Sequence, residues 1–353
     1  MKKIKDVSFP AISRPLVIDL DGTLIKTDLL YETANSLLIS TPLKGIIKLL
    51  YWLCLGIPQL KERLSNEIIL DPSLLPYNSE VIEWIQEQRA HGRKIILATA
   101  SHKKLADQIA KYLDIFDLVL ATDGSINLKS NAKCKMLIER FGEKGFDYLG
   151  NSKSDLIIWR HAYHAYVVNP SPYLLRKAES LNDLVTVFSL KCKPNWQNLI
   201  NALRPHQWVK NLLIFIPLIA TYQINNHEEF KDSIFAFLAF CLTSSSMYLI
   251  NDLVDIWDDR NHDRKKNRPF ASGNLSIPIG WLIFPALIFT SIAISAVFLP
   301  HNFLTYLALY IALTLIYTFK IKEIIIADVL MLALLYTMRI LAGADAITEL
   351  LSI

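Results

Sequence analysis

Apolar runs long enough to cross a membrane occur only beyond about residue 195 of this chain. Before that point charged residues are spread evenly, and Lys, Arg, Asp and Glu still supply 20% of the 353 residues although 52% are hydrophobic. About 20 apolar residues are needed for a helix to span the hydrocarbon core. We therefore expect two unlike domains, residues 1–190 and residues 195–353, the second of them an all-α transmembrane bundle.

The expected spans follow Pro194 and number about five. They are placed at Val209–Tyr222, Ser233–Leu253, Ile279–Leu299, Phe303–Phe319 and Ile324–Ala344. The first is short and contains Pro217.

The charges of the connecting loops predict an orientation. Two connections are basic, and their residues are Arg260, Arg264, Lys265, Lys266, Arg268, Lys320 and Lys322. The alternate connections carry acidic residues or almost no charge. Basic loops stay on the cytoplasmic side, so we expect an integral protein of the bacterial inner-membrane type with its first domain in the cytoplasm. The start of the chain has basic residues but no apolar stretch after them, and no secretory signal is expected.

Short apolar strands alternate with helical stretches in the first domain. The strands are expected within Pro15–Leu20, Arg93–Ser101, Phe116–Asp123, Phe146–Ser152 and Ala165–Pro170. This alternation predicts a parallel, Rossmann-like α/β sheet with its chemistry at the carboxyl ends of the strands.

The segment from about residue 29 to residue 75 departs from that alternation and is long enough to be an inserted helical cap. It contains the apolar run Leu43–Ile57, which carries Lys44, Lys48 and Gly56. This run is short for a membrane span. It could lie in the membrane interface or form a buried cap helix.

Two carboxylates close the first expected strand, in the sequence Asp-Leu-Asp-Gly-Thr. Asp19 and Asp21 are separated by one residue, and Gly22 lets the chain turn. One carboxylate can attack a phosphoryl group while the other moves the proton of the leaving group. Mg²⁺ would offset the repulsion between the two carboxylates and the phosphate, so both are also candidate metal ligands.

This pattern resembles the opening motif DxDGT of the haloacid dehalogenase-like (HAD) phosphatases. The resemblance implies that Thr99 binds phosphate and that Lys133 neutralises the nucleophile, with Lys135 close enough to compete. Asp155 matches the distal acidic metal ligand of that family. Asn151 stands where many relatives have Asp, which should weaken Mg²⁺ binding.

A second group of carboxylates follows the second expected span. Asp252, Asp255 and Asp259 are three and four residues apart, which predicts one face of a helix, whereas Asp258 should lie off that face. Carboxylates gathered at a membrane boundary are costly unless a cation joins them. We therefore expect Mg²⁺ here, bridging to a diphosphate.

Basic residues come directly after these aspartates, ready to take the remaining phosphate charge. A solvated helix end with a basic loop would explain them but not the aspartates. The net charge of +4 is too small and dispersed for a nucleic-acid surface. The expected substrate-binding residues are Asn251, Arg260, Lys265, Arg268, Lys210 and Lys322.

The motif NDxxDxxxD, which begins at Asn251, resembles the first aspartate-rich motif of the UbiA superfamily of membrane prenyltransferases. Arg204–Asn211 and Arg268–Gly273 are similar to the branch that contains decaprenyl-phosphate phosphoribosyltransferase. That resemblance implies phosphoribosyl transfer from phosphoribosyl pyrophosphate to a polyprenyl phosphate. Tyr317 and Tyr336 are expected to be interfacial or packing aromatics.

Two other functions stay open. The same carboxylates would serve an aromatic prenyltransferase that uses a prenyl diphosphate. The chain ends just beyond the fifth expected span without the second aspartate-rich motif of the family, so we expect an incomplete transferase domain. A truncated, inactive chain or a membrane-tethered phosphatase is the third hypothesis.

Overall fold

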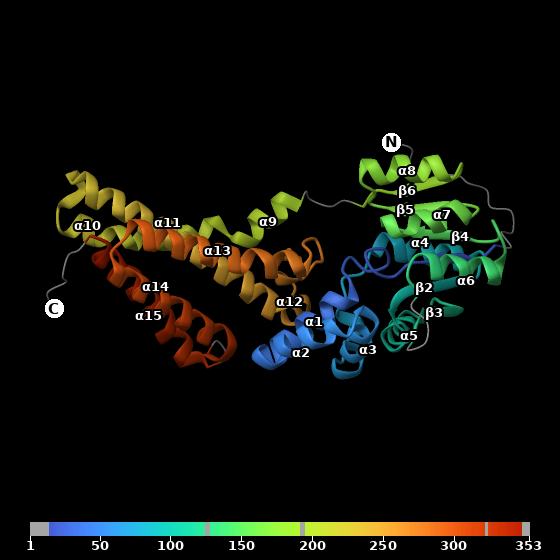
Figure 1. Ribbon diagram of the computed structural model, residues 1–353, viewed down its shortest axis with the longest axis horizontal. Helices are drawn as coiled ribbons and strands as arrows, with labels where there is room; N and C mark the ends of the chain where they lie inside the picture. The colour runs from blue at the N-terminus through green and yellow to red at the C-terminus, as the bar shows by residue number, and fades with distance from the viewer. Residues whose placement is uncertain (1–13, 124–127, 191–194, 322–323, 348–353) are drawn as a thin grey trace. The chain divides into compact units, whose positions relative to one another are not determined.

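The computed structural model describes residues 14–123, 128–190, 195–321 and 324–347 (Figure 1). The chain divides into two compact units, with the boundary between Cys192 and Lys193. The first contains all the strands, and the described part of the second is helical.

Six parallel strands form one sheet in the order β3-β2-β1-β4-β5-β6 (Figure 1). Their bounds are Leu16–Ile18 (β1), Ile95–His102 (β2), Leu118–Thr122 (β3), Asp147–Gly150 (β4), Ala165–Val168 (β5) and Val185–Phe188 (β6). This doubly wound order confirms the Rossmann-like sheet. Its strand order reverses at β1, where such folds place their ligands.

The strand β1 is short but central, with β2 on one side and β4 on the other. All three of its residues are fully buried. A strand covered on both faces needs a continuous apolar run, and the sequence Leu-Val-Ile supplies it. The chain then reaches Asp19 at the carboxyl edge of the sheet, still held by a 2.9 Å hydrogen bond from its backbone N–H to the Leu149 carbonyl.

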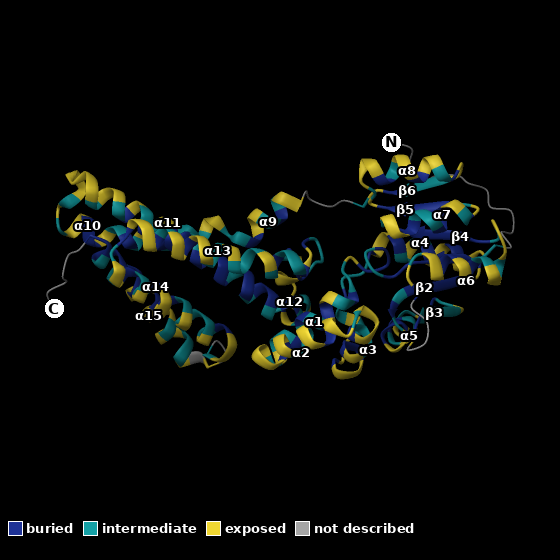
Figure 2. Cartoon of the chain, viewed as in Figure 1, coloured by how far each residue is buried: buried dark blue, intermediate teal, exposed yellow. Residues whose placement is uncertain are grey.

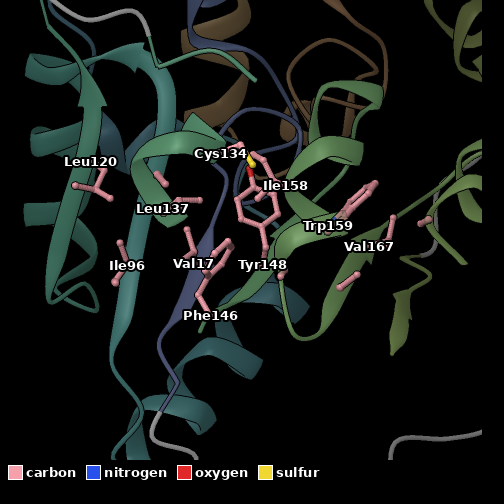
Figure 3. Packing of buried hydrophobic residues seen from close by; sticks show 14 of the residues in the cluster. Val17, Ile96, Leu120, Cys134, Leu137, Phe146, Tyr148, Ile158, Trp159 and Val167 are labelled. Atoms are coloured by element: carbon pink, nitrogen blue, oxygen red, sulfur yellow. The ribbon is translucent and has the colours of Figure 1, made fainter. Parts of the chain in front are cut away.

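Helices cover both faces of the sheet. They are α4 (Ser79–Ala90), α5 (Lys103–Leu113), α6 (Asn131–Phe141), α7 (Leu156–His161) and α8 (Pro172–Leu181). Figure 3 shows Val17, Ile96 and Tyr148 of the strands packed with Leu137 of α6 and Ile158 of α7. On the other face the Trp84 ring of α4 packs against Tyr166 and Phe188.

Three helices form the cap between β1 and β2. They are α1 (Leu29–Ser40), α2 (Pro42–Cys54) and α3 (Ile57–Glu67), and the 3₁₀ turn η1 (Pro72–Leu74) follows them. Asp28 caps α1 by accepting a 2.8 Å hydrogen bond from Leu30 N–H. The Lys61 ammonium donates a 2.8 Å hydrogen bond to the Ala100 carbonyl, which ties α3 to β2. Most apolar side chains of α2 are exposed, so the alternative of a buried cap helix is wrong.

The second unit contains four helices long and apolar enough to cross a membrane among the residues that the structure describes. They are α11 (His227–Val254), α13 (Ile277–Phe298), α14 (His301–Ile316), extended to Ile321 by the π-helical turn η6 (Tyr317–Ile321), and α15 (Ile325–Ala346). The shorter elements are α9 (Asn195–Leu203), η3 (Pro205–Phe215), α10 (Ile216–Ala220), η4 (Gln223–Asn225), α12 (Ile256–Asn261) and η5 (Lys265–Asn267).

The first expected span takes a different form from the other four. It consists of the 3₁₀ helix η3, with 11 residues, and the five-residue helix α10, which has Pro217 in its first turn. A 3₁₀ helix rises about 2.0 Å per residue against about 1.5 Å for an α-helix. Together the two elements extend about 30 Å, close to the hydrocarbon thickness. It is not among the four described helices that are long and apolar enough to cross a membrane, and the fifth expected span therefore stays a prediction.

Hydroxyl groups join α11 to α13. The Ser246 hydroxyl donates to the Phe284 carbonyl at 2.8 Å, and the Ser291 hydroxyl donates to the Ala239 carbonyl at 2.8 Å. Thr243 and Ser291 are joined at 2.7 Å. Small polar residues let helices approach closely where no hydrophobic driving force acts between them. These contacts make α11 the central helix of the unit.

The loop charges and the helix bounds together predict the topology. A reporter fused after Gly273, between α11 and α13, is expected in the cytoplasm because the loop around it is basic. One fused after His301 is expected on the opposite side. Reporter activity on the two sides of the membrane measures this, and the same side for both fusions would contradict the arrangement.

Candidate functional site

The carboxyl edge of the sheet brings Asp19 and Lys133 together. The Lys133 ammonium of α6 donates a 2.7 Å hydrogen bond to Asp19 Oδ1, and both side chains are buried. Burial raises the pKa of Asp19 to about 7, although Lys133 lowers it. Burial alone would lower the pKa of Lys133, but Asp19 and Asp155 outweigh it and the net pKa is raised. Lys135 is exposed and lies 3.8 Å from Glu139, so Lys133 is the residue that reaches Asp19.

Asp21 is held by the cap and by β2. Its Oδ1 accepts a 2.9 Å hydrogen bond from Leu29 N–H, and its Oδ2 accepts a 2.6 Å hydrogen bond from the Ser101 hydroxyl. Burial, reinforced by Asp28, raises the pKa of Asp21 to about 6. A carboxyl group with such a pKa can hold or release a proton near neutral pH.

Thr99 is fully buried at the carboxyl end of β2. Its hydroxyl accepts a 2.9 Å hydrogen bond from Ser101 N–H and lies 3.5 Å from Asp21 Oδ2. Thr99 therefore orders the end of β2, while Ser101 makes the short contact to Asp21. No motif in the sequence indicated Ser101, although it lies near the end of the same strand.

Asp155 organises the loop after β4. Its Oδ2 accepts hydrogen bonds from Asn151 N–H, Ser152 N–H and the Ser152 hydroxyl at 3.1, 2.9 and 2.8 Å. Its Oδ1 accepts a 2.9 Å hydrogen bond from the Tyr148 hydroxyl, which in turn accepts from Lys133 at 3.1 Å. Tyr148 thus connects Lys133 to Asp155, and sequence reasoning had given it no role.

The Asn151 side chain lies against the turn after Asp21. A Cβ at Gly22 would come within 2.1 Å of Asn151 Nδ2, and Gly22 has a φ of +74°, so this turn needs glycine. Asn151 Oδ1 is buried and has no hydrogen-bond partner within the described part of the chain. A buried amide oxygen without a hydrogen-bond partner can serve as a ligand for a hard cation such as Mg²⁺, which takes oxygen ligands.

The described residues contain no group of three His, Cys, Asp or Glu side chains close enough to hold a metal by themselves. Mg²⁺ is usually bound through one or two carboxylates with water and substrate phosphates completing the shell. Asp19, Asp21 and Asn151 Oδ1 fit that donor set, whereas the Asp155 carboxylate is already fully hydrogen-bonded.

The second candidate site begins where α11 ends. Asp255 is the C-cap of α11 and the residue before α12, with φ −89° and ψ 9°. The helix is therefore interrupted between Asp252 and Asp259, although both carboxylates still contact the same Arg268 guanidinium. Asp258, expected off the face, lines the cavity of this unit together with Asp255 and Asp259.

Arginines from two other segments bind Asp252 and Asp259. Arg268 Nη1 lies 3.2 Å from Asp252 Oδ1 and 2.8 Å from Asp259 Oδ2. Arg204 makes a further ion pair with Asp252. Asp252 and Asp259 are each 1% exposed, so charge pairing is what permits their burial. Asp252 is paired with both arginines and is not among the residues that line the cavity described below.

A cavity of about 550 Å³ lies beside this cluster. Its charged lining combines cations and carboxylates, and its other walls are aromatic, hydroxyl-bearing or apolar. The lining includes Arg204, Lys210, Lys265, Arg268 and Arg339, the carboxylates Asp255, Asp258 and Asp259, and Asn251, Tyr248, Tyr310, Tyr317, Tyr336, Met247, Leu332 and Leu335. Such a cavity can take a phosphorylated group and an apolar chain at once.

Four of the six expected substrate-binding residues line this cavity, namely Asn251, Lys210, Lys265 and Arg268. Arg260 does not: its Nε donates a 2.9 Å hydrogen bond to the Ala271 carbonyl and its guanidinium stacks 4.9 Å from the Trp257 ring. Lys322 lies outside the described residues.

Tyr317 and Tyr336, expected to be interfacial or packing aromatics, line the cavity. Arg339, on α15, is 5% exposed and donates hydrogen bonds of 2.8 Å to Asn211 Oδ1 and to the Tyr310 hydroxyl. Arg339 is a polar position of the fifth expected span, and a charged residue inside a span is itself a functional signal.

Comparison with known proteins shows what the second unit is similar to. The profile of the UbiA prenyltransferase family matches residues 212–353. "Uncharacterized protein y4nM" of Sinorhizobium fredii is 36% identical over 329 residues, which are 93% of this chain and 63% of that protein. A protein named decaprenyl-phosphate phosphoribosyltransferase, from Mycolicibacterium smegmatis, is 35% identical over 152 residues, 42% of this chain and 48% of that protein.

A solved structure of a phosphoserine phosphatase with bound substrate aligns with 49% of this chain and 92% of its own, at 18% identity and a TM-score of 0.35. The chain spans 63% of the length of the Sinorhizobium fredii relative and about half of the length of the other curated relatives.

Removing Arg268 is expected to destabilise the second unit. Arg268→Met would leave Asp259 buried without its cation and Asp252 with Arg204 alone. Breaking such a buried pair costs about 3 kcal/mol. Unfolding of the purified chain in detergent measures the loss. Lys266→Met is the matched control. The Lys266 ammonium lies 3.7 Å from the exposed Asp263 carboxylate, so its removal should change the stability little. Equal stability of the two variants would contradict the role of Arg268.

Proposed function

We propose that this chain, whose second unit is a UbiA-family domain, joins a phosphoribosyl transferase acting on a polyprenyl phosphate to a Mg²⁺-dependent phosphatase-like domain. The observation that carries the transferase part is the 550 Å³ cavity, which combines phosphate-binding cations, carboxylates and apolar walls. The name of the Mycolicibacterium smegmatis relative supports the substrate class.

The lining residues supply what this transfer needs. Lys210, Lys265 and Arg268 would bind the phosphate groups. Asp255 and Asp258 would hold Mg²⁺, which when bound neutralises the charge of the leaving diphosphate. An oxygen of the polyprenyl phosphate bonds to the anomeric carbon of the ribose, the bond from that carbon to the diphosphate breaks, and pyrophosphate leaves. Met247, Leu332 and Leu335 offer apolar contacts to a prenyl chain.

Mg²⁺-dependent binding of the sugar diphosphate tests this proposal. Asp255→Asn is expected to weaken Mg²⁺-dependent binding of phosphoribosyl pyrophosphate by about 1 to 3 kcal/mol, because a charged contact is lost. Asp258→Asn should do the same, since the structure places Asp258 in the cavity. Calorimetry on the purified chain, with and without Mg²⁺, gives the numbers.

Asp263→Asn is the control for this experiment, because its carboxylate is fully exposed. A prenyl diphosphate with an aromatic acid forms the second arm. Mg²⁺-dependent binding of the prenyl diphosphate and none of the sugar diphosphate would replace the proposal with an aromatic prenyltransferase.

The first unit is proposed to act by attack of Asp19 on a phosphoryl group. A bond forms from an Asp19 oxygen to phosphorus as the bond to the leaving oxygen breaks, and Asp21 gives that oxygen its proton. Water then hydrolyses the aspartyl-phosphate. Lys133 holds Asp19 in place and offsets the charge of the phosphoryl group, and the Tyr148 hydroxyl orients the ammonium.

Asp19→Asn is expected to abolish Mg²⁺-dependent phosphatase activity, because an amide is not a nucleophile. Hydrolysis of a generic aryl phosphate by the full chain measures it. Lys133→Ala should also remove activity, while Lys135→Ala, two residues along the same helix but exposed, should leave it unchanged. Asn151→Asp should lower the Mg²⁺ concentration required. Full activity of the Asp19→Asn variant would remove Asp19 from its role.

A further inference from the structure

Helix α2 of the cap turns its apolar side chains away from the protein. Leu43, Ile47 and Leu50 are 80%, 68% and 60% exposed. Their spacing, with Ile46 between them, makes one continuous stripe along a helix. Figure 2 shows α2 mostly in the colour of exposed residues. The apolar stripe is thus on the outside of this helix.

The opposite side of α2 is the side that packs. Gly45 and Trp52 are buried, seven residues apart on the same face. Gly45 meets α1 so closely that a Cβ there would lie 2.9 Å from the Leu37 carbonyl oxygen. The packing on α1 therefore fixes which side of α2 points outward, and rotation of the helix cannot bury the stripe.

Another helix of the same unit shows the usual arrangement. In α5, Leu105, Ala106 and Ile109 are buried, whereas Lys104 and Lys111 are exposed. An exposed contiguous apolar face in a soluble domain marks an interaction surface. Helix α2 has the reverse arrangement of α5, and so it needs a partner.

The residues around the stripe match the chemistry of a lipid surface. Helix α2 has no acidic residue, and its Lys44 is exposed, whereas Lys48 pairs with Glu67 of α3. Tyr51 is 58% exposed, with the Arg63 guanidinium 5.9 Å from the centre of its ring. Cations suit anionic head groups, and tyrosine is enriched at the depth of the head groups. The same polypeptide carries four helices of membrane length, so a bilayer is always within its reach.

We propose that α2 is an interfacial helix that inserts its stripe of Leu43, Ile46, Ile47 and Leu50 into the bilayer surface. The cap of the first unit then lies at the membrane surface. This inference does not depend on the transferase activity.

Fluorescence quenching in lipid nanodiscs tests the proposal on the full chain. An environment-sensitive fluorophore is attached at Leu50→Cys after Cys54 and Cys192 are changed to Ser, since Cys134 and Cys241 are buried. The matched control carries the label at Lys177→Cys, an exposed position of α8. We expect a label at position 50 to be quenched several-fold more by spin-labelled lipid than one at position 177, and less by aqueous iodide.

A second variant separates insertion from an effect of the label. Ile47→Glu, with the fluorophore on the native thiol of Cys54, should lose most of the lipid quenching while the unfolding temperature stays the same, because Ile47 makes few contacts. Quenching by iodide equal to that at Lys177 would overturn the proposal, since the stripe would then face water. Protection from both quenchers would overturn it too, because a protein surface would then cover α2.

Discussion

Pairing of buried carboxylates with cations from other elements is a constraint that both units share. Asp19 lies at the carboxyl edge of the sheet and needs Lys133, which is 114 residues away in the chain. Asp252 and Asp259 lie at the end of a membrane helix and need Arg268 and Arg204. An uncompensated carboxylate in either place would cost several kcal/mol. The pairs therefore fix α6 against β1 in one unit, and the loop after α12 against α11 in the other.

The two units satisfy their buried charged groups in different surroundings. In the first unit, helices on both faces of the sheet exclude water. The Asp19 site lies at the carboxyl edge of the sheet, where the strand order reverses. In the second unit lipid surrounds the helices, so polar groups must be satisfied within the protein. Arg339 shows how this is done: one guanidinium binds Asn211 of η3 and Tyr310 of α14 from its place on α15. Three segments are thereby held around one cavity.

The sequence predicted the sheet, the cap and the positions of both acidic clusters, because these depend on local pattern. Alternating strands and helices indicate a parallel sheet, and DxDGT after an apolar strand indicates the edge where Asp19 lies. The details that failed depend on tertiary geometry. A regular helix through Asp259 would have put Asp258 off the site, but the interruption at Asp255 brings it to the cavity. Ser101, Tyr148 and Arg204 were missed because each acts through a contact that no spacing in the sequence reveals.

The central position of β1 has a consequence for biosynthesis. Its three apolar residues leave the ribosome long before their hydrogen-bonding neighbours, β2 and β4, which begin only at Ile95 and Asp147. Pairing partners so far along the chain make a slow, non-local step. During translation β1 therefore has at most one of its two neighbours until synthesis has passed β4, and one edge of this apolar strand stays unpaired over that interval.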